Sequence, residues 1–199
     1  MKKTLAALSA IYLLSACAAF QTDYVVKENS EHSSFAPAWT VQSRAYRIDS
    51  YAQTKQFLYF VGEANDPKQR LCRKYAEKDA VQKTASDAAQ KIMRRFEQKK
   101  NESALIAPEL KNKLEKNILV NLQGSITAGK YWEKRDYLKE KGAKSNYTTY
   151  KCNVVNKIKK SDLAETLEAS KAKATKALSD KDKKAADKAI DAYIADLKR

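Results

Sequence analysis

The sequence predicts an α+β fold in which a small antiparallel sheet of about three strands packs on a long helix. The expected element order is β-α-α-β-β, followed by a C-terminal helical extension. Three observations carry this prediction. Short runs of aromatic and β-branched residues predict strands, long stretches with apolar residues at three- and four-residue spacing predict amphipathic helices, and helical spacing returns near the C-terminus.

Residues 1–16 have the layout of a secretory signal peptide. Lys2 and Lys3 precede an apolar run over residues 5–14, and small residues follow that run. The run is shorter than the about 20 apolar residues that span a bilayer core. We therefore expect residues 1–16 to direct export and then to be removed.

The tetrapeptide Leu14-Ser15-Ala16-Cys17 resembles the lipobox that lipoprotein signal peptidase recognises. The resemblance implies cleavage between Ala16 and Cys17 and attachment of fatty acyl chains, such as palmitate, to Cys17. Two or three such chains anchor a protein stably, whereas one is marginal. Ala18 stands where many inner-membrane lipoproteins carry aspartate, so the resemblance favours the outer membrane, on its periplasmic face rather than the cell surface. The alternative is an ordinary cleavage site beside an incidental cysteine.

Residues 17–36 are mostly polar and show little apolar periodicity, which predicts a flexible tether that begins at the lipidated cysteine. The one histidine of the chain, His32, lies alone in this polar stretch, so we expect no metal-binding or catalytic role for it. An α+β domain is expected over residues 37–160 and a C-terminal helical tail over residues 161–199.

The first predicted strand covers residues 57–64, which are rich in aromatic and β-branched side chains. Asp66 and Pro67 suit the start of a helix. From residue 68 to about residue 99, apolar residues recur at helical spacing, and we expect their stripe to face the core with Cys72 pointing away from it. The residues of this stripe are Leu71, Val81, Ala85, Ala88, Ala89, Ile92 and Phe96. Its alanines are expected to let the helix lie close to a sheet.

A second helix is expected after Pro108 and ends at Gly124, because apolar residues recur between them at helical spacing. Residues 125–137 and 146–158 are again rich in aromatic and β-branched residues and predict two strands. The basic, turn-forming residues 139–145 join them, so the pair should form an antiparallel hairpin.

From Asp162 onward the pattern is helical, with Asp162 and Glu165 at the spacing of a capping box. Ser179 and Asp180 can begin a further helix. Two alternatives are open for this tail. It packs on its own domain, or it extends as a helix that docks on a partner or self-associates.

With Cys17 lipidated, Cys72 and Cys152 remain in a compartment where disulfides persist. Cys152 is in phase with Tyr150 and Val154 and is expected to point inward, whereas the helical pattern places Cys72 outward. Two alternatives stay open. The cysteines form a Cys72–Cys152 disulfide, or Cys152 is a buried thiol and Cys72 a partly exposed one.

The formal net charge is +15, and it is unevenly distributed. Residues 68–160 hold 24 basic and 10 acidic side chains, a net charge of +14. Because the chain is expected to be exported, nucleic acid is not its expected partner. Anionic glycans, lipid headgroups and acidic protein surfaces remain, beside a plain solvated surface. The aromatic residues Trp39, Tyr131, Trp132 and Tyr137 either form a ligand-binding face or pack the hairpin and core.

The residue pattern predicts that this protein is not an enzyme. Nucleophilic catalysis needs a base beside the nucleophile, and the one histidine lies in the expected tether. The four glycines are scattered, so no phosphate-binding loop is expected. Cysteines and histidine are far apart in sequence, which argues against a zinc site. We expect no catalytic residue, no metal and no cofactor.

Several short motifs together resemble the twenty-kilodalton outer-membrane lipoprotein family (LPP-twenty), which is related to the flagellar lipoprotein FlgP and the N-terminal part of the flagellar-ring protein FlgT. The motifs lie within residues 37–160 and are Pro-Ala-Trp at 37–39, Tyr-Phe-Val-Gly-Glu-Ala at 59–64, Tyr-Trp-Glu at 131–133 and Tyr-Lys-Cys-Asn-Val at 150–154. The resemblance implies a small β-α-β-β sandwich on the outer membrane, without enzymatic activity, that joins envelope or motor-associated structures. The long linking helix and the Lys-rich tail depart from the family pattern.

The sequence thus predicts a non-enzymatic lipoprotein that acts as an envelope structural or protein-interaction module through a protein partner or self-association. The family resemblance extends this expectation to motility-associated assembly. Two alternatives are retained. One is a basic periplasmic module that binds anionic glycan or lipid headgroups, and the other is an activator of a peptidoglycan synthase.

Overall fold

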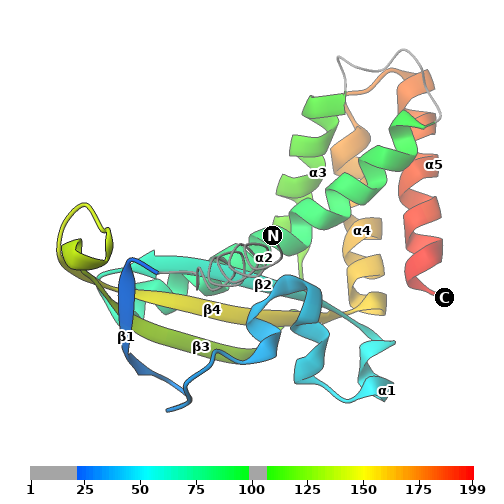
Figure 1. The fold of residues 1–199 in the computed structure, drawn as a ribbon. Helices are drawn as coiled ribbons and strands as arrows, with labels where there is room; N and C mark the ends of the chain where they lie inside the picture. The colour runs from blue at the N-terminus through cyan, green and yellow to red at the C-terminus, as the bar shows by residue number, and fades with distance from the viewer. Residues whose placement is uncertain (1–21, 99–106) are drawn as a thin grey trace, which may run out of the picture.

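The computed structural model describes residues 22–98 and 107–199 of the chain (Figure 1). Its elements combine one sheet with a group of helices. In chain order they are β1 (Tyr24–Asn29), the 3-10 helices η1 (Ala38–Thr40) and η2 (Gln42–Ile48), α1 (Tyr51–Thr54), β2 (Phe57–Asp66), α2 (Gln69–Glu97), α3 (Ala107–Asn121), β3 (Ile126–Tyr137), the 3-10 helix η3 (Lys139–Lys141), β4 (Tyr147–Lys159), α4 (Lys160–Thr175) and α5 (Asp180–Leu197).

The sheet is antiparallel and has the strand order β1-β3-β4-β2. It confirms the predicted α+β class and the expected hairpin of β3 and β4. It has four strands in the described residues rather than about three, because β1 lies inside residues 17–36, where a flexible tether was expected. That expectation was wrong for residues 24–29. The strand is short and half of it is exposed, so its apolar pattern is weak, and its pairing with β3 is a contact more than 100 residues away in sequence.

Helix α2 connects the two parts of the molecule. Its first half packs on β2 and β4, and its second half continues into a group of helices with α3 and α5 (Figure 1). Ala76 and Ala85 are nine residues apart, which at about 100° per residue places them on opposite sides of the helix. The side with Cys72, Ala76 and Ala80 is buried toward the sheet, and the side with Ala85 belongs to the core shared with the other helices.

This two-sided packing corrects two expectations. Cys72 does not point away from the core, because its relative exposure is 0%. The predicted stripe of Ala85, Ala88 and Ala89 faces the helices, so it is not what brings α2 close to the sheet. A single stripe was expected because one helix was assumed to have one partner, whereas α2 has a sheet first and helices afterwards.

Close approach of α2 to the sheet depends on Gly62 in β2. A Cβ atom at this position would lie 1.9 Å from the backbone oxygen of Ala76 and 2.3 Å from the backbone nitrogen of Ala80. No side chain fits there. The glycine and the two alanines together fix how closely the helix and the strand pack.

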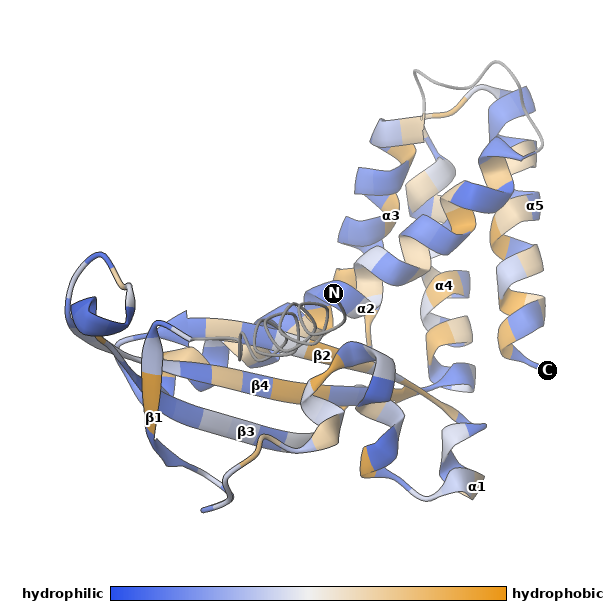
Figure 2. Cartoon of the chain, viewed as in Figure 1, coloured by the Kyte–Doolittle hydropathy of each residue, from blue (hydrophilic) through white to orange (hydrophobic). Residues whose placement is uncertain are grey.

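The C-terminal helices belong to the same core as the rest of the chain, which decides between the two alternatives for the tail. Leu163, Leu167 and Ile190 are buried in one cluster with Phe60 of β2 and Ile158 of β4. In Figure 2 helices α3, α4 and α5 carry alternating hydrophobic and hydrophilic bands, typical of amphipathic helices. Residues 161–199 therefore pack on their own domain.

Strand β4 runs directly into α4, whose N-cap is Lys159 with no side-chain capping hydrogen bond. Asp162 lies inside the first turn, so the predicted capping box of Asp162 and Glu165 was wrong. The predicted start of a helix at Ser179 and Asp180 is confirmed. Ser179 caps α5, and its Oγ accepts a hydrogen bond from the backbone nitrogen of Asp182 at 3.2 Å.

We expect Gly62→Ala to destabilise the protein by more than about 3 kcal/mol, because the new methyl group meets backbone atoms that cannot move without shifting α2. Gly142→Ala is the matched control. Gly142 has open space around it but a φ of 102°, so its replacement should cost only about 1–2 kcal/mol. Denaturant unfolding of both variants measures the difference, and equal losses would contradict the close approach at Gly62.

Candidate binding surfaces

The expected acylation site Cys17 and the cleavage-site residue Ala16 lie outside the described residues. The backbone oxygen of Asp23 already accepts a hydrogen bond from the backbone nitrogen of Leu138 at 3.0 Å, so the chain joins the sheet there. The six residue steps from Cys17 to Asp23 can span at most about 20 Å. A lipid on Cys17 would therefore hold the sheet much closer to a membrane than a twenty-residue tether would. Among the helices of residues 22–98 and 107–199, none has the length and apolarity to cross a bilayer.

Cys72 and Cys152 form a disulfide that ties the first turns of α2 to the middle of β4. Their Cα atoms are 5.7 Å apart, within the usual range for a disulfide, and the bond links residues 80 positions apart. Both cysteines are fully buried, beside Ala76 and Val154. The structure thus has the disulfide that the sequence left open, and Cys72 is not a partly exposed thiol.

Three tyrosines from three neighbouring strands form a row at the hairpin end of the sheet. Tyr24, Tyr137 and Tyr147 occupy one register position across β1, β3 and β4. The rings of Tyr137 and Tyr147 stack with centroids 4.5 Å apart, and Tyr24 lies 5.3 Å from Tyr137. Tyr147 is 50% exposed, so the row ends in an open ring.

A buried ion pair holds this row in place. The guanidinium of Arg135 pairs with the carboxylate of Glu133, and the carbon of the same guanidinium lies 4.0 Å from the ring centroid of Tyr24. The hydroxyl of Tyr131 donates a hydrogen bond to the other Glu133 oxygen at 3.0 Å. Burial and the neighbouring Glu133 carboxylate raise the pKa of Tyr131, which keeps its hydroxyl a donor.

The four aromatic residues considered in the sequence do not form one ligand-binding face. Trp39 packs over Gly129 on the face of the sheet opposite α2, and Tyr131 is buried. Trp132 packs beside the disulfide on the α2 side, with its ring 5.8 Å from that of Tyr150. Only Tyr137 belongs to the exposed row.

The loop between β3 and β4 adds positive charge beside the tyrosine row. Lys139, Lys141 and Lys144 are exposed, and no ion pair involves them within the described residues. Asn146 shapes the loop, because its side-chain oxygen accepts a hydrogen bond from the backbone nitrogen of Lys139 at 2.7 Å. The tyrosine row and these lysines together form a surface suited to a flat or anionic ligand.

A second basic surface, called here the basic corner, lies at the other end of β4. It is a pocket of about 510 Å³ between α1, the junction of β4 and α4, and the end of α5. No acidic side chain lines it. Its lining residues are Lys55, Gln56, Lys159, Lys160, Ser161, Leu197, Lys198 and Arg199.

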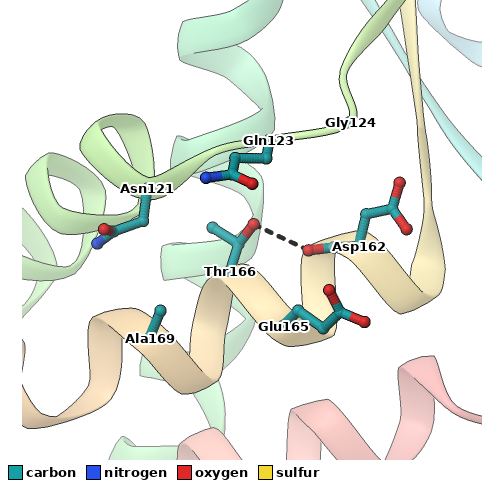
Figure 3. A pocket seen from close by; sticks show the side chains of 7 residues that line it. All are labelled: Asn121, Gln123, Gly124, Asp162, Glu165, Thr166 and Ala169. Atoms are coloured by element: carbon teal, nitrogen blue, oxygen red, sulfur yellow. Dashed lines mark hydrogen bonds between the residues drawn. The ribbon is translucent and has the colours of Figure 1, made fainter.

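A separate pocket, of about 380 Å³, lies between the end of α3 and the start of α4 (Figure 3). Within it the hydroxyl of Thr166 donates a hydrogen bond to the backbone oxygen of Asp162 at 2.8 Å. The pocket is polar, and its two carboxylates are at least partly exposed, so we assign no chemistry to it. It is lined by Asn121, Gln123, Gly124, Asp162, Glu165, Thr166 and Ala169.

In the part of the chain that the structure describes, no group of three or more histidine, cysteine, aspartate or glutamate side chains is placed to hold a metal ion. His32 has a φ of 50° and lies in the turn after β1. Comparison with protein-family models, curated proteins and solved structures finds no significant match to this chain.

The sequence missed Tyr24 and Tyr147 as partners of Tyr137, and it missed the grouping of Lys55 with Lys198. A period-two pattern in β1 was the one available signal for Tyr24, and it was too short to use. Nothing in the sequence places the turn after α1 beside the end of α5, because those residues are more than 140 positions apart.

We expect the folded protein, purified without reductant, to have an intact mass lower by two hydrogen atoms than the reduced protein. Because the Cys72–Cys152 bond closes a long loop, its loss should lower the free energy of unfolding by about 2–5 kcal/mol. Unfolding with and without dithiothreitol measures this. A C72A/C152A variant should match the reduced protein and be indifferent to dithiothreitol, and alkylation of Cys72 or Cys152 in the folded, unreduced protein would contradict the disulfide.

Proposed function

We propose that this chain is a non-enzymatic lipoprotein of the bacterial envelope, anchored through Cys17 to the outer membrane and acting as a structural or interaction module in the periplasm. The buried Cys72–Cys152 disulfide is the observation that carries the proposal. Structural disulfides persist in oxidising compartments such as the periplasm and are rare in the cytosol. The disulfide therefore supports export independently of the lipobox-like residues 14–17.

The element order also supports the proposed relation to the LPP-twenty family. Strand β2, helix α2 and the hairpin of β3 and β4 give the β-α-β-β order that the resemblance implies. Two motif residues support the fold. Gly62 allows close packing of α2 on β2, and Cys152 forms the disulfide with Cys72. Helices α3, α4 and α5 and strand β1 are additions to that pattern.

A partner is expected to bind side-chain surfaces rather than extend the sheet. The outer edge of β2 is covered, because the amide of Gln42 donates to the Tyr59 oxygen and accepts from the Val61 nitrogen, both at 2.7 Å. Lys83 donates to the Val61 oxygen at 2.9 Å. At the other edge, β1 is short and its register with β3 shifts after Val26. The covered edge of β2 and the short, register-shifted β1 both disfavour the addition of a further strand to the sheet.

A second candidate function is binding of an anionic glycan in the envelope. The specific observation that favours it is the open ring of Tyr147 next to the exposed loop lysines Lys139, Lys141 and Lys144. Aromatic faces and cations together suit a sugar chain that carries carboxylates or phosphates.

The anchoring proposal predicts that cells fed a labelled fatty acid incorporate the label into the wild-type protein and not into C17S. The thiol of Cys17 is the group that is expected to carry the acyl chain, so its loss should abolish the labelling. S15A is the matched control, because alanine keeps the small residue that a lipobox requires. Equal labelling of C17S and S15A would contradict acylation at Cys17.

Capture experiments at low and high salt separate the two candidate functions. Binding to a purified envelope glycan through the loop lysines should weaken steeply with ionic strength and be lost in K139E/K144E. Binding to a defined protein through the tyrosine row should persist at high salt and be weakened at least about tenfold by Y147A. A protein partner that binds Y147A and K139E/K144E as well as wild type would contradict the use of this end of the sheet.

A further inference from the structure

We propose that the basic corner binds the phosphate groups of anionic phospholipids, so that the folded domain lies along the membrane surface instead of standing away from it. The proposal deepens the proposed function and, in its geometry, rests on anchoring at Cys17. Lipid binding by the corner itself does not depend on the anchor.

The charge of the basic corner is left unbalanced. Lys55, Lys159, Lys160 and Lys198 take part in no ion pair within the described residues, and Arg199 makes one long contact of 3.9 Å with Asp196 between exposed groups. Several lysines elsewhere in the described residues pair closely with carboxylates. Examples are Lys91 with Asp87 at 2.7 Å, Lys113 with Glu109 at 2.6 Å and Lys171 with Asp191 at 2.6 Å. An anion in the corner would thus supply the counter-charge that the protein does not.

The backbone around the corner is held by the fold rather than by the lysines themselves. The backbone nitrogen of Lys160 donates a hydrogen bond to the Gln56 oxygen at 2.9 Å, which joins the turn after α1 to the start of α4. Leu197, with 6% relative exposure, fixes the end of α5 in the helical core. The cations are therefore presented at fixed positions around a pocket of about 510 Å³, large enough for a phosphate-bearing headgroup.

Helix α4 adds to the attraction for an anion. It has 16 residues and begins at Lys160, next to the pocket, and no side chain caps its N-terminus. The N-terminus of a helix carries partial positive charge that favours anions. Here it reinforces five side-chain cations that come from separate parts of the chain.

The surroundings of the corner fit a membrane surface. Tyr51, which begins α1, is 80% exposed, and the ammonium of Lys55 lies 5.4 Å from its ring centroid. Exposed tyrosines are typical of the headgroup level of membranes, where the ring meets lipid and the hydroxyl stays in water. Inorganic phosphate would contact only the cations, whereas a phospholipid can contact both the cations and the ring of Tyr51.

The reach of the anchor is also compatible with membrane contact at the corner. Lys159 is 12 residues along β4 from Tyr147, and Tyr147 shares a register row with Tyr24 of β1. At about 3.3 Å per residue the corner is about 40 Å from that row. Because Cys17 can lie no more than about 20 Å from Asp23, anchor and corner can touch one bilayer when β4 runs roughly along it.

The test measures sedimentation of the full mature chain with vesicles. The protein carries C17S and is exported through a conventional cleaved signal peptide, so that no acyl chain contributes. We expect binding to vesicles containing phosphatidylglycerol, little binding to phosphatidylcholine alone, and weakening with salt. K159E/K198E should reduce the affinity for anionic vesicles at least about tenfold, since each basic residue near an anionic surface contributes about fivefold.

K74E/K78E is the matched control, because it changes the net charge equally at two exposed lysines on the first half of α2, outside both basic surfaces, and should bind like wild type. K159Q/K198Q serves if charge reversal shifts the thermal unfolding midpoint. Equal weakening by the control variant, equal binding to neutral vesicles, or binding of inorganic phosphate without vesicle binding would each overturn the proposal. Failure of acylation in the labelling experiment leaves this result untouched, so the two proposals fail separately.

Discussion

The structure depends on helix α2 having two buried sides. Its first half lies against the sheet, where Gly62 allows backbone contact with Ala76 and Ala80, and the Cys72–Cys152 bond fixes the same contact covalently. Its second half belongs to the core of α3, α4 and α5. One continuous helix serves both parts, and the hydrophobic cluster of the helical group extends to Phe60 of β2 and Ile158 of β4, so packing is not interrupted at residue 161.

Electrostatics follow from this arrangement. A chain with a net charge of +15 has more cations than it can pair, and the fold decides which cations are left over. Buried cations are satisfied, as shown by Arg135 with Glu133 and by Lys157, which lies 2.7 Å from a carboxylate oxygen of Asp49. Two groups of lysines without an ion pair in the described residues lie at the two ends of β4, in the loop after β3 and in the basic corner. Both clusters are far from the contact of α2 with the sheet, so they can serve binding without weakening the core.

The predictions that succeeded used local patterns. Strand β2, the hairpin of β3 and β4, and helices α2 to α5 were visible as periodic runs, and Ser179 marked the start of α5. The failures at β1, Cys72 and the basic corner share a different cause, because each needed knowledge of a distant partner. Strand β1 is a strand because β3 lies beside it, and Cys72 is buried because the first half of α2 faces the sheet rather than helices. The grouping of Lys55 with Lys198 is set by where α5 ends, which no local pattern records.

Strand β1 has the largest consequence for how the protein would sit in the envelope. A tether of twenty polar residues would let the domain stand off the membrane and turn freely, whereas pairing that starts at Asp23 ties the sheet to the region of the anchor. With an anchor at Cys17 the tyrosine row would lie near the membrane at one end of the sheet, whereas the unpaired cations of the corner lie at the other end. A domain held by acyl chains at one end gains from a weak second contact at the other, because the first attachment raises the effective concentration of the second. The same contact would fix which surfaces of the helical group face the membrane and which face the periplasm.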